Sequence, residues 1–159
     1  IPVAMGLLQA DGTPVAGSER VLVLDSAQQS WTFDALDAAP VASLLRGFSA
    51  PVILEWEASE AELFTLLGHD TDAFNRWEAG QRLAVARLLG AVRAGAPLVL
   101  DAAYLDAMRA VLRDAALDCA FKELVLSLPD EDEIAEQTTP HERWWRLSFV
   151  HGCGICGDT

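Results

Sequence analysis

The alternation of apolar and polar residues divides the chain into a strand-like first third and a helix-like remainder. Apolar runs of strand length, bounded by Gly, Pro or Asp-Gly turns, occupy residues 1–8, 20–24, 30–36 and 51–57. The run 30–36 alternates strictly, which places Trp31 and Phe33 on one face. Asp11-Gly12, between the first two runs, favours a hairpin turn. We expect these short strands to form a β-sandwich or part of one.

From Ser59 onward the apolar positions follow a helical period. Ser59 and Glu62 have the spacing of a capping box, in which each residue binds the backbone N–H of the other. Further helix starts are indicated by aspartates in capping positions: Asp70-Thr71-Asp72, Asp101 and Asp118. Helix ends are indicated by residues that break helices: Gly68, Gly95 and Pro129. The short connections predict antiparallel neighbours, as in a helical bundle or the start of an α-solenoid, so the predicted fold class is α+β in two parts.

The charge balance restricts the classes of partner. With 11 Lys+Arg against 24 Asp+Glu the formal net charge is −13. Nucleic acids and anionic membranes are bound through basic side chains, so neither is expected as a partner. No apolar run has the roughly 18–20 residues of a membrane span, and no basic segment followed by an apolar one suggests a secretory signal. Three cysteines do not make a disulfide framework. These features predict a soluble, cytoplasmic protein.

A metal or redox site is suggested by the C-terminal residues His151, Cys153 and Cys156. A C-x-x-C pair can hold zinc or exchange a disulfide. Structural zinc needs four ligands, for which the fourth candidate would be His141. A redox pair is typical of the turn between a strand and a helix, whereas this pair lies among glycines near the chain end. We predict no metal ligand here, and a small metal- or redox-binding module remains the alternative.

No catalytic motif is complete. His141-Glu142 resembles the start of a zinc-peptidase helix, but the second His must follow four residues later, where Trp145 stands. The chain has no Gly-rich phosphate loop and no G-x-S-x-G motif. We therefore predict no catalytic residue in this chain.

Two stretches carry a family resemblance. Residues 43–52 (SLLRGFSAPV) and 69–81 (HDTDAFNRWEAGQ) resemble the part of bacterial aminopeptidase N that follows its catalytic domain. The likeness covers roughly residues 1–137. It implies an Ig-like β-sandwich over residues 1–57, entered part-way through, and the first helices of the C-terminal helical domain over 58–137. Residues 138–159 form a divergent tail, for which we expect a truncated or frameshifted end.

The resemblance also implies a function. The family are gluzincin zinc metallopeptidases that remove N-terminal residues from peptides, using H-E-x-x-H and G-A-M-E-N motifs that are absent here. It implies that this chain is a noncatalytic scaffold that caps the active site, that zinc lies in a catalytic domain outside the chain, and that the partners are this domain and peptides. An autonomous protein-binding domain is the other alternative.

Six residues are predicted to join the sandwich to the helices. They are aromatic or Arg side chains on either side of the boundary between the two parts: Arg46, Phe48, Trp56, Phe74, Arg76 and Trp77. Large rings and guanidinium groups bury much area and suit such a joint.

Overall fold

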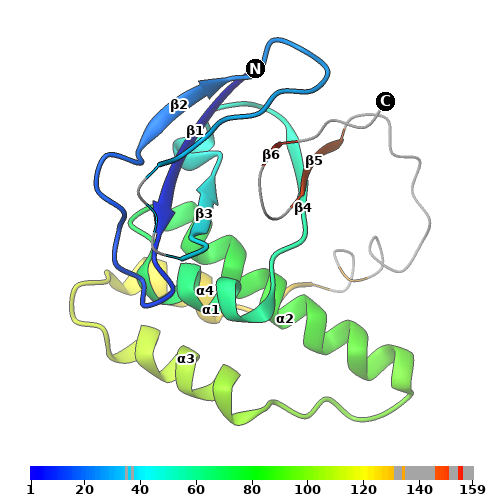
Figure 1. Cartoon of the computed structure of the whole chain (residues 1–159). Coiled ribbons are helices and arrows are strands. Elements are labelled where there is room, and N and C mark those ends of the chain that lie inside the picture. Colours follow the sequence, from blue (N-terminus) through cyan, green and yellow to red (C-terminus); the bar gives the residue numbers. More distant parts are fainter. Residues whose placement is uncertain (35, 37, 131–133, 135–145, 151–153, 156–159) are drawn as a thin grey trace.

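The chain forms a small β part packed on a layer of helices (Figure 1). The structure, a computed structural model, describes residues 1–34, 36, 38–130, 134, 146–150 and 154–155. One antiparallel sheet has the order β2-β1-β3, made of β1 (Pro2–Leu8), β2 (Arg20–Val23) and β3 (Val41–Leu44). A second sheet has the order β4-β5-β6, made of β4 (Ile53–Trp56), β5 (Arg146–Val150) and β6 (Gly154–Ile155). The prediction of strands followed by helices is confirmed for β1 to β4 and the four α-helices, and β5 and β6 follow the helices.

The four α-helices begin where the sequence predicts. They are α1 (Glu60–His69), α2 (Ala73–Ala94), α3 (Ala102–Arg113) and α4 (Cys119–Leu126). The 3-10 turn η1 (Arg46–Phe48), between β3 and β4, was not predicted. The capping box of Ser59 and Glu62 is present. Three of the predicted capping aspartates each accept a backbone N–H three residues later, which satisfies a donor that the helix leaves unpaired: Asp72, Asp101 and Asp118.

The predicted helix ends are only partly right. Gly95 ends α2 in the left-handed conformation, with φ 59°. Gly68 does not end α1, which continues to His69. Asp70 ends it instead by turning extended while its N–H still bonds Leu66 O. Similarly, α4 ends at Leu126, before Pro129 is reached.

The strand predicted at residues 30–36 is wrong, and β3 was not predicted. Trp31, Phe33 and Leu36 lie half-buried against the interior of the sheet, but among the described residues this segment is not a strand. The position beside β1 is taken by Val41–Leu44, which pairs with Met5–Leu8. The alternation in the sequence therefore indicates which rings are buried, and not which segment pairs with β1 in the sheet.

The predicted tail, residues 138–159, lies partly within the described residues. Residues 146–150 pair in parallel with β4, and residues 154–155 pair with β5. The candidates His141, His151, Cys153 and Cys156 lie outside the described residues.

Apolar side chains pack on both faces of the first sheet. The sandwich core is made mainly by alternate residues of the strands: Val3, Met5, Leu7, Leu22, Ala42, Leu44, Leu45 and Ala50. The helical core joins the other face to all four α-helices: Leu8, Val41, Leu63, Leu66, Leu67, Ala79, Leu83, Ala84, Tyr104, Met108, Val111 and Val125. The first sheet therefore lies between the two cores and contributes side chains to both. Among the described residues no helix is long and apolar enough to cross a membrane.

Candidate functional site at the junction of sheet and helices

Arg46 is the charged centre of the junction. Its side chain, 16% exposed, lies across β1 so closely that a Cβ on Gly6 would stand 2.4 Å from Nη1. Its guanidinium lies 3.7 Å from the Asp70 carboxylate and 3.5 Å from that of Glu19. It also donates a hydrogen bond to Thr71 Oγ1. One side chain of the sheet part therefore holds the turn between α1 and α2.

Two aspartates of that turn, Asp70 and Asp72, contact the sheet part and the start of α2. The Asp70 side chain is only 1% exposed, and its Oδ1 accepts the Asp72 N–H at 2.9 Å. Its Oδ2 has no hydrogen-bond partner among the described residues. Asp72 accepts the Gly47 N–H at 2.8 Å with one oxygen and the Asn75 N–H at 3.0 Å with the other. A single carboxylate thus caps α2 and ties η1 to it.

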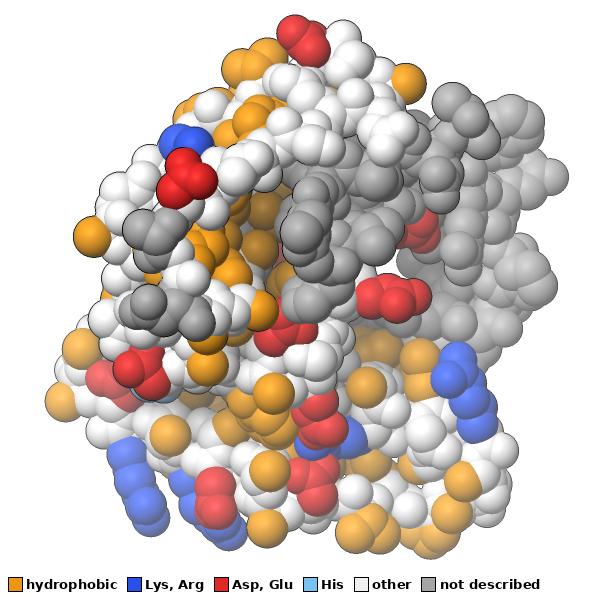
Figure 2. All heavy atoms as spheres, viewed as in Figure 1, with side chains coloured by type: hydrophobic (Ala, Val, Ile, Leu, Met, Phe, Trp, Pro, Cys, Tyr) orange, Lys and Arg blue, Asp and Glu red, His pale blue; other side chains and the backbone are white. Residues whose placement is uncertain are grey.

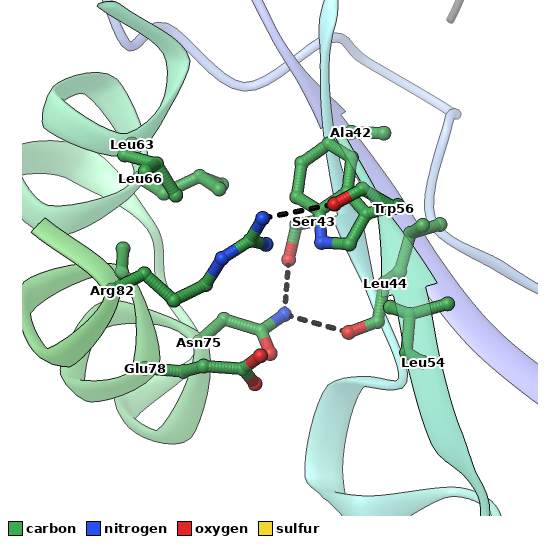
Figure 3. A pocket seen from close by; sticks show the side chains of 11 residues that line it. Ala42, Ser43, Leu44, Leu54, Trp56, Leu63, Leu66, Asn75, Glu78 and Arg82 are labelled. Atoms are coloured by element: carbon green, nitrogen blue, oxygen red, sulfur yellow. Dashed lines mark hydrogen bonds between the residues drawn. The ribbon is translucent and has the colours of Figure 1, made fainter. Parts of the chain in front are cut away.

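Asn75 joins α2 to β3 (Figure 3). Its buried amide donates to Ser43 Oγ at 2.8 Å and to the Leu44 carbonyl at 3.0 Å. Both amide hydrogens are therefore used across the junction, and buried donors and acceptors of this kind are costly to leave unpaired.

Three of the predicted aromatic residues form an aromatic ladder, by which we mean Phe48, Phe74 and Trp77. The ring centroids of Phe48 and Phe74 are 4.0 Å apart, and those of Phe74 and Trp77 are 5.5 Å apart. Phe48 is 69% exposed. Such ring pairs stabilise by about 0.5–1.5 kcal/mol.

The backbone that presents Phe48 is strained. Leu45, Gly47 and Phe48 all have positive φ, at 54°, 60° and 55°. Only Gly adopts this region readily, and another residue costs roughly 1–2 kcal/mol there. The strain at Phe48 therefore offsets the stability that its ring pair contributes.

The other two predicted junction residues, Arg76 and Trp56, make separate contacts. Arg76 donates to the carbonyls of Leu67 and Gly68 at 2.9 and 3.3 Å and lies 5.8 Å from the Phe121 ring centroid, so these contacts join helices to one another. Burial lowers the pKa of Arg76. The Trp56 carbonyl accepts a hydrogen bond from Arg82 at 2.8 Å, which forms a second tie between β4 and α2.

The sequence did not indicate most of the polar contacts that join the sheet to the helices, which we call the joint. Ser43, Asn75 and Arg82 were not singled out, and Asp70 and Asp72 were identified only as a helix cap. Hydrophobic periodicity carries no signal for such contacts, since the partners Arg46 and Asp70 are far apart in sequence. The local signal for a further polar contact was the pair Asp70 and Asp72, since a helix cap requires only one aspartate.

A hollow lies between β3, β4, α1 and α2 (Figure 3). Its volume of about 20 Å³ suffices for one water molecule. Its polar lining is formed by Ser43, Asn75, Glu78 and Arg82. Burial raises the pKa of the Glu78 carboxyl, an effect that the Arg82 charge reduces, and burial lowers the pKa of Arg82.

Glu78→Gln is expected to stabilise the protein at pH 7. Because the folded-state pKa is raised, the folded protein holds a proton on Glu78 that the unfolded chain releases at lower pH. The free energy of unfolding therefore falls as pH rises from the ordinary pKa through the raised one. The gain from Gln should be present at pH 7 and should shrink toward pH 4.

Urea unfolding at several pH values measures this difference. Glu123→Gln, an exposed position on α4, is the control, because surface substitutions usually change stability by less than about 0.5 kcal/mol. A loss of stability at pH 7 in Glu78→Gln would show that the charged carboxylate is favoured in the folded state.

Among the described residues, no group of three or more His, Cys, Asp or Glu side chains lies close enough together to hold an ion. Cys119, the first residue of α4, is an exposed free thiol. The described residues therefore offer no donor set that fits zinc.

Two family models match the two parts of the chain. Residues 1–57 match a domain of unknown function (DUF3458) described as having an Ig-like fold. Residues 60–145 match a domain of unknown function (DUF3458_C) described as ARM repeats. The class of protein is therefore an Ig-like unit followed by ARM-like helices.

Sequence relatives identify the family. The chain is 48% identical over 133 residues to aminopeptidase N of Caulobacter vibrioides and 40% identical over 132 residues to that of Escherichia coli K12. A Legionella pneumophila aminopeptidase A, crystallised with aspartic acid, superposes with a TM-score of 0.75 at 32% identity, over 86% of this chain and 16% of that one. The chain belongs to the bacterial aminopeptidase N family, through its Ig-like domain and the start of its C-terminal helical domain.

The match covers most of this chain but little of its relatives. It includes 83% and 81% of the chain, and 15% of the length of each of the two aminopeptidases N.

Proposed function

We propose that this chain is a noncatalytic scaffold portion of a zinc metalloaminopeptidase that removes N-terminal residues from peptides. The observation that carries the proposal is the 48% identity to Caulobacter aminopeptidase N over 133 residues. The polar joint supports a scaffold role, because Arg46, Asp72 and Asn75 fix the first turns of α2 against the sheet. A rigid joint would hold the helices in one orientation over a neighbouring domain.

The remaining parts of the proposal concern the whole enzyme. The helices would cap the active-site cavity and limit access of peptides to it. Zinc would be bound by the catalytic domain, outside this chain, and this domain would be its partner. We propose a cytoplasmic location on the charge and composition given above.

A segment exchange tests the scaffold role. The 133-residue segment of Caulobacter aminopeptidase N is replaced by the matching residues of this chain, and hydrolysis of a chromogenic alanyl substrate is measured. We expect the exchanged enzyme to be active and the isolated chain to be inactive. Activity of the isolated chain would contradict a noncatalytic role, and an exchanged enzyme that folds and binds zinc but does not hydrolyse the substrate would contradict the scaffold role.

A further inference from the structure

We infer that the aromatic ladder of Phe48, Phe74 and Trp77 is the surface by which this chain docks on the rest of an aminopeptidase polypeptide. The inference rests on the proposed function and adds the contact surface and its chemistry. The partner face it fits is apolar and able to enclose an aromatic ring.

The first argument is the conformation of the segment that carries Phe48. Positive φ at Leu45, Gly47 and Phe48 turns the chain so that the Phe48 ring leaves the sheet and stands on Phe74. Strain of this kind is typically found at functional positions, where the surrounding structure maintains it. Within the chain itself Phe48 remains 69% exposed, so the strained backbone presents a ring that the fold does not bury.

The second argument is the polarity around the ladder. The neighbouring charged groups are already paired inside the joint, Arg46 with Asp70 and Asp72 with the Gly47 and Asn75 N–H groups. A partner that covers the rings therefore need not remove an unpaired charge from water. Phe48 is an exposed ring beside the half-buried Phe74 and Trp77, and large aromatic side chains of this kind are typical of the central contacts of protein interfaces.

The third argument is that the ladder leads into a groove. Trp77 also lines a hollow of about 540 Å³ between α2 and α4, together with Gln81, Leu124 and Leu128. Leu124 and Leu128 are 54% and 56% exposed. The ladder and this groove give a continuous surface that begins at η1 and extends along α2, apolar at Trp77, Leu124 and Leu128 and polar at the groove residues Gln81, Glu123, Ser127 and Asp130.

The occupant follows from the lengths of the relatives. The chain spans 15% of the Caulobacter and E. coli aminopeptidases N and 16% of the Legionella aminopeptidase A. Most of an enzyme of this kind lies outside residues 1–159, and other exposed apolar side chains are visible over both parts of the molecule (Figure 2). A covalently linked domain is a better fit to such a surface than a partner that exchanges.

The test is Phe48→Gly, which removes the ring and the backbone strain together. It is measured in the isolated chain and in the segment-exchanged Caulobacter enzyme described above. We expect the midpoint of thermal unfolding of the isolated chain to change little. In the exchanged enzyme we expect irreversible inactivation at a fixed elevated temperature to become at least about tenfold faster. Phe48→Tyr, which keeps the ring, and Val99→Ala, an 81%-exposed valine between α2 and α3, should resemble the parent.

Each other outcome has a definite meaning. An active exchanged enzyme whose inactivation rate is unchanged by Phe48→Gly overturns the inference and leaves the proposed function intact. An exchanged enzyme that folds and binds zinc but is inactive contradicts the proposed function. An equal effect of Val99→Ala would show that exposed apolar area in general, not the ladder, stabilises the enzyme. Self-association of the isolated chain that Phe48→Gly abolishes would assign the ladder to a second copy and overturn the inference.

Discussion

Leu83→Ala is expected to lower the free energy of unfolding by about 3–4 kcal/mol. Leu83, on α2, is 1% exposed and belongs to the helical core, which joins β1 and β3 to all four α-helices. Removing its branched end loses transfer free energy and leaves a cavity that neighbours from several elements cannot easily fill. For a chain of this size the midpoint of thermal unfolding should fall by roughly 6–16 °C.

Thermal unfolding followed by circular dichroism measures the effect. Leu112→Ala is the matched control, since the same substitution is made in α3 at a side chain that is 56% exposed. It should change stability by less than about 0.5 kcal/mol. Equal losses at the two positions would show that helix formation, and not burial in the helical core, determines the result.

Asn75→Leu is the second substitution with a large expected effect. It removes both amide donors, so that the buried Ser43 hydroxyl and the Leu44 carbonyl lose their partner on α2. A buried polar group left unpaired costs about 1–3 kcal/mol. We expect a total loss of about 3 kcal/mol, or roughly 6–12 °C in the midpoint of thermal unfolding.

A double-mutant cycle with Ser43→Ala isolates the polar contact. Once both partners are apolar, no hydroxyl remains unpaired, so Ser43→Ala should cost less in the Asn75→Leu background than alone. Additive losses would show that the Asn75 and Ser43 side chains do not interact, so that the effect of Asn75→Leu comes from the lost bond to the Leu44 carbonyl and from the change in side-chain shape.

The helices were predictable because their signals are local. Ser59, Asp72, Asp101 and Asp118 each cap an N–H three residues away, so the sequence spacing contains the whole interaction. Gly95 has a positive φ that its lack of a side chain permits. Gly68 misled because nothing at its position requires a positive φ, and the helix simply continues through it.

The strands and the joint were less predictable because their partners are distant in sequence. Trp31 and Phe33 alternate with polar residues as in a strand because one side of this segment packs on the sandwich core. The backbone of the segment nevertheless does not pair with a strand of the sheet. Val41–Leu44 has no alternation, since both of its faces are covered, one by each core. Aromatic and Arg residues near the boundary were recognised, but their pairing with Asp70, Asp72 and Asn75 depends on how α2 is set against the sheet.

The carboxylate of Asp72 has a consequence for how the molecule opens. It accepts one N–H from η1 and one from the first turn of α2, while Asn75 in that turn donates to β3. The amide protons of Gly47 and Asn75 therefore share one acceptor residue and should exchange with solvent in the same opening event. We therefore expect the start of α2 to fray less than a free helix end does, and the sheet and this helix to open as one cooperative unit in hydrogen exchange.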